Sequence, residues 1–362
     1  MARELGLGGT ERQLAETALS LDRARFTPHV GCFRPGGFRE AELRAAGVPV
    51  VDLGVTSLVS TPLAAGIRRL GRYLEAHEIR LVHTFDVPLD LFGVPVARWF
   101  RVPVVLSSQR AHRALTPGLT RHLLRLTDHI ADGIVVNSRS VARELIAQDA
   151  VPASRIHLAY NGIDTSIFRP EGPAVERPWQ DATIIGVVCA LRPEKGLPLL
   201  IEAFAKVRRT YAGARLLFVG SGPVQAELEG LAGSLGVGGD CRFAGAAKNV
   251  ADWLRAIDIF VLPSLSEALS NSLMEAMACG CCAVASDAGG NPELVRDGEC
   301  GLLFPVGDAA ALAGRLDRLL GNAEERRRMA GNGARIMREN FNRESAARRM
   351  GNIYEKFLGG LK

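Results

Sequence analysis

Short apolar runs alternate with amphipathic segments along the first half of the chain. The apolar runs are rich in Val, Ile and Leu, which is typical of strands buried on both faces of a parallel sheet. The segments between them carry apolar residues at helical spacing. The expected strands lie at 28–33, 48–53, 79–83, 102–107 and 133–136. The expected helices lie at 11–21, 62–77, 87–100, 118–129 and 138–148.

A break in composition then interrupts this alternation. Residues 168–181 contain Pro170, Pro173 and Pro178 without hydrophobic periodicity, so we expect a linker there. The alternation restarts at 182. The expected strands are 182–190, 214–220, 241–245, 258–264, 281–286 and 301–306, and the helices between them are 196–209, 223–235, 248–256 and 271–279. Residues from about 308 to 358 read as consecutive helices.

The sequence therefore predicts an α/β protein with two doubly wound, Rossmann-like domains that face each other across a cleft. A length of 362 residues agrees with two domains, because domains commonly hold roughly 100–200 residues. We place the first domain at 1–167, the linker at 168–181 and the second domain at 182–340. Ligands of open α/β sheets bind at the carboxyl ends of the strands, so the loops there are the first place to look for function.

Composition and cysteine usage narrow the class of protein. With 47% hydrophobic and 23% charged residues, the chain has an ordinary globular composition. It contains no apolar run of about 18 residues and its opening lacks a signal-peptide core, so we expect a cytoplasmic protein. The seven cysteines are an odd number within apolar runs, which favours reduced thiols. We expect Cys279, Cys281 and Cys282 to be buried packing rather than a metal site, because no histidine lies at zinc spacing.

The positive charge of the chain is concentrated in its first half. Residues 1–170 contain 21 Lys and Arg against 16 Asp and Glu, whereas residues 171–362 contain 23 of each. Six arginines between Arg98 and Arg125 precede the first acid, Asp128, and Trp99 lies among them. This stretch is either a solvated arginine-rich surface or a face for anionic lipid or a phosphorylated acceptor. No nucleic-acid-binding signature accompanies it, so we expect no nucleic-acid partner.

Two turns have the composition of an anion site. Gly8 and Gly9 lie in a glycine-rich turn that leads into the first helix, whose free N–H groups attract an oxyanion. The alternative is a plain helix start capped by Thr10. After the strand at 182–190, Arg192 and Lys195 are placed to clamp a diphosphate, the alternative being a solvated turn. The chain has only five lysines against 39 arginines, which makes a lysine at this strand end notable.

The loop and helix start around residue 270 carry the most specific pattern. Leu269, Ser270 and Asn271 precede a helix whose first amides are expected to face the same cleft as Lys195. Glu267 lies before that helix start, and Glu275 lies in the first helical turn, within reach of a hydroxyl pair beside a bound phosphate. Two alternatives stay open: Glu275 belongs to a capping box with Ser272, or Glu267 lies in a solvated loop.

Taken together, these motifs resemble the retaining nucleotide-sugar-dependent glycosyltransferases of family 4, which have the GT-B fold. The resemblance is carried by GLGGTERQL at 6–14, NGID at 161–164, LRPEKG at 191–196, VGSGP at 219–223, the two glutamates in SEALSNSLMEAMACG at 266–280, and DAGGNPELVRDGECGLLFP at 287–305. It covers nearly the whole chain.

The resemblance implies a sugar transfer from a UDP- or GDP-linked donor to an acceptor hydroxyl, with no obligatory metal. It assigns an acceptor side to the first domain, a donor side to the second, and a final helix at 341–362 that returns toward the first. By this resemblance Lys195 and Arg192 bind the donor diphosphate, Glu275 binds the ribose and Glu267 lies beside the transferred sugar. The further substrate-binding residues are Gly8, Gly9, Gln109, Arg110, Gly222, Leu269, Ser270 and Asn271. The partners expected are the donor and a glycan or lipid-linked acceptor. From the basic first half of the chain we also expect peripheral binding to an anionic membrane surface.

Three departures from the family pattern affect these expectations. An arginine common in the family is Ala190 here, and a histidine common after the fourth expected strand is replaced by Gln109-Arg110. Only MAREL precedes the glycine turn, so the first strand looks absent, and we expect a weakly stable first domain and an upstream apolar extension of about 10–15 residues. Removing a buried strand leaves neighbours unpaired at ~1–3 kcal/mol per group. A UDP-sugar epimerase and a silent nucleotide-sugar-binding module remain alternatives.

Overall fold

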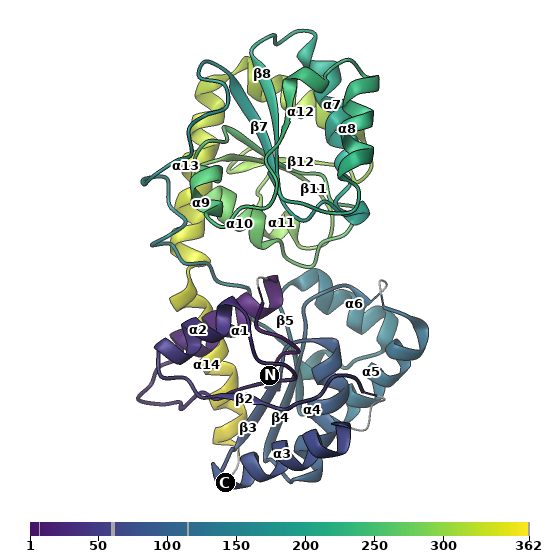
Figure 1. Cartoon of the computed structure of the whole chain (residues 1–362), viewed down its shortest axis with the longest axis vertical. Coiled ribbons are helices and arrows are strands. Elements are labelled where there is room, and N and C mark those ends of the chain that lie inside the picture. The colour runs from purple at the N-terminus through teal and green to yellow at the C-terminus, as the bar shows by residue number, and fades with distance from the viewer. Residues whose placement is uncertain (7, 59–61, 114–115, 361–362) are drawn as a thin grey trace. The chain divides into compact units, whose positions relative to one another are not determined.

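The computed structural model of the chain describes residues 1–362 except 7, 59–61, 114–115 and 361–362. It divides into two compact units (Figure 1). The first unit comprises Met1–Gly162 together with Arg343–Lys362, and the second comprises Ile163–Asn342. Each unit is a parallel sheet with helices packed on it, as the alternation of strand and helix predicts.

The first unit contains a four-stranded parallel sheet and a two-stranded one. The four-stranded sheet has the order β3 (Leu81–Thr84), β4 (Val104–Gln109), β5 (Gly133–Val136) and β6 (Ile156–Leu158), and the two-stranded sheet pairs β1 (Val30–Cys32) with β2 (Val50–Asp52). The helices are α1 (Gly9–Ser20), α2 (Phe38–Ala45), α3 (Pro62–Ala76), α4 (Val87–Trp99), α5 (Gly118–Ile130), α6 (Arg139–Asp149) and α14 (Arg343–Gly359). Strands β4 and β5 are buried along their whole lengths and lie in the middle of this sheet.

Residues 1–3 join the two sheets of the first unit. Ala2 pairs with Cys32 as an isolated parallel bridge, and its amide donates to the Gly31 carbonyl at 3.1 Å. On the other side the Met1 ammonium donates to the His83 carbonyl at 2.6 Å. In the described residues no named strand precedes α1. The first residues nevertheless pair with β1 and β3, which the sequence did not indicate.

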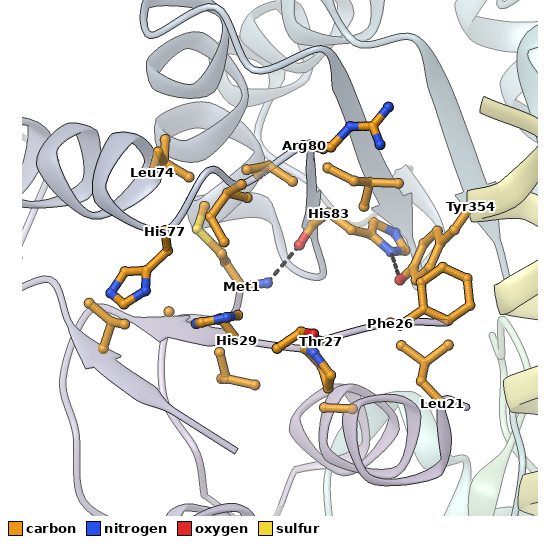
Figure 2. A pocket seen from close by; sticks show the side chains of 18 of the residues that line it. Met1, Leu21, Phe26, Thr27, His29, Leu74, His77, Arg80, His83 and Tyr354 are labelled. Carbon is orange, nitrogen blue, oxygen red and sulfur yellow. Dashed lines mark hydrogen bonds between the residues drawn. The ribbon is translucent and has the colours of Figure 1, made fainter. Parts of the chain in front are cut away.

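A cavity of about 530 Å³ continues from Met1 along the edges of β1 and β3 (Figure 2). Helices α1, α3 and α14 supply its other walls, mostly with apolar side chains. At one end the His29 Nδ1 and the Tyr73 hydroxyl lie 2.6 Å apart, with His77 beside them. The space between β1 and β3 is therefore filled by the first residues at one end and left open at the other.

The second unit is built on one six-stranded parallel sheet. Its order is β12 (Gly301–Phe304), β11 (Cys282–Ser286), β10 (Ile259–Leu262), β7 (Thr183–Val188), β8 (Ala214–Val219) and β9 (Cys241–Phe243). Its helices are α7 (Leu197–Arg208), α8 (Gln225–Ser234), α9 (Val250–Leu254), α10 (Asn271–Ala278), α11 (Asn291–Leu294), α12 (Ala309–Gly321) and α13 (Ala323–Asn340). Aliphatic side chains and the stacked rings of Phe218 and Phe243 form its core.

The strands and helices expected before residue 308 are present, with ends that differ by at most two residues. Helices α2 and α11 and strand β6 were not expected. Helix α2 buries the arginine Arg39 beside Leu43, which blurs its apolar periodicity, and β6 is only three residues long. The proline-rich residues 168–181 lie in the second unit, where Arg255 donates to the Pro173 carbonyl at 2.7 Å.

Candidate active site

The loops that follow β7 and β10 lie at the point where the strand order of the second sheet reverses. From β7 the chain moves outward to β8 and β9, and it later returns to place β10 on the other side of β7. Ligands of open α/β sheets bind at such a switch point. The loop after β7 carries Arg192 and Lys195, and the loop after β10 carries Glu267. The structure therefore brings these expected residues to one place.

Lys195 and Glu267 form an ion pair in this site. The Lys195 Nζ lies 2.5 Å from the Glu267 Oε1, and the two side chains are 21% and 11% exposed. The Ser264 hydroxyl donates to the same carboxylate oxygen at 2.9 Å. Since both side chains are largely buried and oriented by this contact, Glu267 is not in a solvated loop.

The two loops are also tied by their backbones. The Leu265 amide donates to the Glu194 carbonyl at 2.9 Å, and the Gly290 amide donates to the Glu267 carbonyl at 3.2 Å. Gly196 has a φ of +62°, and a Cβ there would lie 2.2 Å from the Pro263 carbonyl oxygen. Only glycine allows these loops to approach so closely, and this approach holds the neighbouring Lys195 in place.

Gly222 has a structural role of the same kind. It lies in the turn after β8, and a Cβ there would lie 2.2 Å from the Leu191 carbonyl oxygen. The turn after β8 thus packs directly on the backbone that leads to Arg192. The Arg192 side chain itself is 63% exposed and lies 4.0 Å from Glu194, a distance at which a surface pair contributes little. Its guanidinium is therefore available for a ligand.

Helix α10 begins beside this pair of loops. Its N-cap is Ser270, whose hydroxyl accepts a hydrogen bond from the Leu273 amide at 3.3 Å. The capping box of Ser272 with Glu275 is therefore not the cap of this helix. Glu275 is 3% exposed and Leu269 6% exposed, so both side chains are packed into the unit. Glu275 is the fifth residue of α10 and so lies beyond the first helical turn, in which the sequence had placed it. Its buried carboxylate has the chemistry to accept hydrogen bonds from a hydroxyl pair.

The helix that follows the glycine turn of the first unit does not have the Thr10 cap that was the alternative interpretation of this turn. The N-cap of α1 is Gly8, not Thr10, and Gly9 is the first helical residue. A Cβ on Gly8 would lie 2.1 Å from the Glu11 carboxylate, so this acid of the first turn packs over the glycine. The preceding Leu7 is outside the described residues.

Gln109 and Arg110 lie at the end of β4 and have different environments. The Gln109 amide nitrogen donates to the Ala111 carbonyl at 2.6 Å, and its amide oxygen accepts from Arg113 Nε at 2.9 Å. Arg110 donates to the Asn161 side chain at 2.9 Å, and its guanidinium lies 4.6 Å from the centre of the Phe85 ring. Burial lowers the pKa of Arg110 to about 10, which leaves it positively charged at neutral pH. Asn161 and Phe85 are contacts that the sequence did not single out.

The arginine stretch after Arg98 is largely neutralised by acids that come later in the chain. Arg113 forms two hydrogen bonds with Asp128, at 2.6 and 2.9 Å. Arg121 and Arg125 each lie 2.9 Å from Asp149. Arg98 pairs with Asp132 at 2.6 Å. The net positive potential of this face is therefore smaller than its count of arginines indicates.

The clustered cysteines and the helices are the candidates for a metal site and for a membrane span. Cys279, Cys281 and Cys282 are buried, and burial raises the pKa of the Cys279 and Cys282 thiols to about 12. Among the residues that the structure describes, no group of three His, Cys, Asp or Glu side chains is suited to hold a metal ion. Across the same residues, no helix combines the length and apolar composition needed to cross a bilayer.

Two family descriptions match the chain, one for each unit. Residues 7–167 match Glycosyltransferase Family 4, and residues 169–336 match Glycosyl transferases group 1. The MMP alpha-(1->4)-mannosyltransferase of Mycolicibacterium hassiacum is 32% identical over 269 residues, which are 73% of this chain and 62% of that protein. The GDP-mannose-dependent alpha-(1-6)-phosphatidylinositol monomannoside mannosyltransferase of Mycolicibacterium smegmatis is 29% identical, covering 81% of this chain and 80% of that protein.

The fold is shared with a solved structure over almost its full length. The crystal structure of Anabaena Alr3699/HepE in complex with UDP superposes with a TM-score of 0.86 at 20% identity, covering 98% of each chain. The chain spans 62%, 53% and 55% of the length of three curated relatives that it matches. With both units matched in this way, the chain belongs to the family 4 glycosyltransferases, which have the GT-B fold.

Proposed function

We propose that this protein is a retaining glycosyltransferase that moves a sugar from a nucleoside diphosphate sugar to an acceptor hydroxyl. The observation that supports it most is the placement of Lys195, Glu267 and the start of α10 together at the switch point of the second sheet. In the reaction the bond from the anomeric carbon to the diphosphate oxygen breaks, and its electron pair stays with the diphosphate. The acceptor oxygen bonds to that carbon on the same face, and its proton passes to the departing diphosphate oxygen.

The departing diphosphate gathers negative charge, and the site offers groups that stabilise it. We assign Lys195, the exposed Arg192 and the amides at the start of α10 to this charge. Glu275 is assigned to the ribose hydroxyls, and Leu269, Ser270 and Asn271 to the wall of the donor site. In the first unit we assign Gly8, Gly9, Gln109 and Arg110 to the sugar and the acceptor, with Arg110, which is cationic at neutral pH, as a donor to an oxygen.

The ion pair of Lys195 with Glu267 indicates how the donor would be received. A diphosphate carries more negative charge than a carboxylate, so it competes for the Lys195 ammonium. When Lys195 turns to the diphosphate, the Glu267 carboxylate still accepts the hydrogen bond from the Ser264 hydroxyl at 2.9 Å. Its negative charge, beside the sugar, is then no longer neutralised by Lys195. A carboxylate in that position stabilises positive charge as it develops at the anomeric carbon.

The names of relatives support the donor and the acceptor class that we propose. One relative is named as GDP-mannose-dependent and as acting on a phosphatidylinositol monomannoside, and the HepE structure contains UDP. We therefore propose a UDP- or GDP-linked donor, no obligatory metal, and a glycan or lipid-linked acceptor in the synthesis of cell-surface glycans or glycolipids. The protein is proposed to act at the cytoplasmic face of the membrane, to which it binds peripherally.

Incubation with radiolabelled UDP- and GDP-sugars tests this proposal. Sugar transfer or slow donor hydrolysis is expected, and the anomeric configuration of the product, read by NMR, should equal that of the donor. Interconversion of the sugar without transfer would identify an epimerase of the same fold. Tight binding without turnover would identify a binding module, and an inverted product would refute the retaining mechanism.

A further inference from the structure

Helix α5 (Gly118–Ile130) carries an apolar stripe that faces solvent. Leu119 is 76% exposed, Leu126 65%, Ile130 43% and Leu123 41%. Their spacing of four, three and four residues places them along one side of the helix. In most surface helices such a stripe is the buried side. Here it points away from the unit, which requires an explanation.

The buried side of α5 explains this orientation. Leu124 is fully buried, and Asp128 is held by Arg113 inside the unit at 2.6 and 2.9 Å. A buried ion pair that is broken leaves an uncompensated charge in the core, so this contact fixes which side of α5 turns inward. The apolar stripe of α5 therefore faces solvent.

A tryptophan extends this apolar surface. Trp99, the last residue of α4, is 82% exposed. Its neighbour Arg98 donates to the Ile130 carbonyl at 2.7 Å, so the ends of α4 and α5 lie side by side. We define the α5 apolar face as Trp99, Leu119, Leu123, Leu126 and Ile130.

Basic side chains border the α5 apolar face. Arg101 is exposed, and Arg121 and Arg125 are partly exposed. Between Arg98 and Asp132 the sequence contains six arginines and two acids, of which Asp128 is buried and Asp132 is paired with Arg98. The border of the face is therefore complementary in charge to anionic headgroups.

We propose that the α5 apolar face docks on an anionic lipid bilayer, with α5 lying in the plane of the interface. An amphipathic helix binds a bilayer in this way when apolar side chains reach the acyl region and cations remain at the headgroups. Tryptophan is enriched at that depth. This inference rests on the lipid-linked acceptor proposed above. It assigns the main contribution to the exposed apolar residues, because Asp149 already neutralises part of the arginine charge.

Sedimentation with vesicles of phosphatidylglycerol and phosphatidylcholine tests the proposal. The wild-type protein is expected to sediment, and the double variant Leu119→Ser, Leu126→Ser to bind at least tenfold more weakly. Leu235→Ser is the matched control, because Leu235 is 42% exposed but lies on the second unit, and it should bind as the wild type does. Fluorescence of Trp99 should shift to shorter wavelength on binding, in a chain with Trp179 and Trp253 replaced by Phe.

Other outcomes would contradict the proposed docking on a bilayer. Equal binding by the double variant and the wild type, or no binding by either, would overturn the proposal. Self-association of the lipid-free protein that the double variant loses, seen by gel filtration, would assign the face to a second copy instead. Donor hydrolysis in the absence of lipid is measured on the same variants, and its presence without vesicle binding would reject the docking face while retaining the transferase.

Discussion

The Lys195 ammonium donates a hydrogen bond to the Glu267 carboxylate across 72 positions of sequence, at 2.5 Å. The cation assigned to the donor diphosphate is thus already neutralised within the second unit. A donor that binds there must exchange one ionic contact for another. The two residues should therefore respond differently when each is removed.

Replacing Lys195 by alanine should lower kcat/KM at least 100-fold, about 2.7 kcal/mol, because a cation that stabilises the leaving diphosphate is lost. Lys206→Ala is the matched control, since Lys206 is an exposed lysine on α7 of the same unit. Steady-state transfer kinetics measure the effect, and thermal melting checks the fold. Near-normal turnover would remove Lys195 from the site.

Replacing Glu267 by glutamine should leave nucleoside diphosphate affinity unchanged or raise it, because the variant frees Lys195 from its carboxylate partner. Turnover should fall, since the carboxylate beside the sugar is lost. Titration calorimetry with UDP and GDP and a transfer assay measure the two effects. Tenfold weaker nucleotide binding would contradict this role.

Replacing Glu275 by glutamine should weaken nucleoside diphosphate binding about tenfold, which corresponds to ~1.4 kcal/mol. The reason is that the carboxylate is assigned to the ribose hydroxyls, and charged acceptors form the stronger hydrogen bonds. A 2′,3′-dideoxynucleoside diphosphate is the control, because it should bind the wild type and the variant equally. An equal loss with this ligand would point to a structural role for Glu275.

Replacing Arg113 by leucine should destabilise the first unit by about 3–5 kcal/mol, because Asp128 would then be buried without its cation. Arg113 is 2% exposed and also lies 3.7 Å from Asp149. Arg68→Leu, at an exposed position of α3, should change stability little. Urea unfolding of the two variants measures the difference, and similar midpoints would show that the pair does not stabilise the unit.

The stability of the first unit should fall as the pH drops below about 6.5, the ordinary pKa of histidine. The buried His83 ring lies 2.8 Å from the Tyr354 hydroxyl (Figure 2) and, on its other side, 2.7 Å from the Ser108 hydroxyl. Burial, and then the positive charges of Met1 and Arg110, hold the pKa of His83 well below its usual value. The unfolded chain therefore takes up a proton in this range that the folded chain does not, and stability is lost as the pH falls.

His83→Gln is the variant that isolates this effect. It retains hydrogen-bonding capacity but does not titrate, so its stability should depend less on pH between about 5 and 7 than that of the wild type. Urea midpoints at several pH values give the comparison. Parallel pH dependence in the two proteins would show that another group is responsible.

The sequence by itself determined the two α/β units, nearly every strand and helix, and the positions of Lys195 and Glu267 in loops that follow strands. These features are local, because hydrophobic period, glycine turns and caps depend on neighbouring residues. The tertiary structure decided which side chains meet. It paired Lys195 with Glu267, turned Gln109 toward Arg113, matched the arginine stretch with Asp128 and Asp149, and left the leucines of α5 outside. Such contacts depend on how segments distant in the sequence pack together, so no local sequence pattern predicts them.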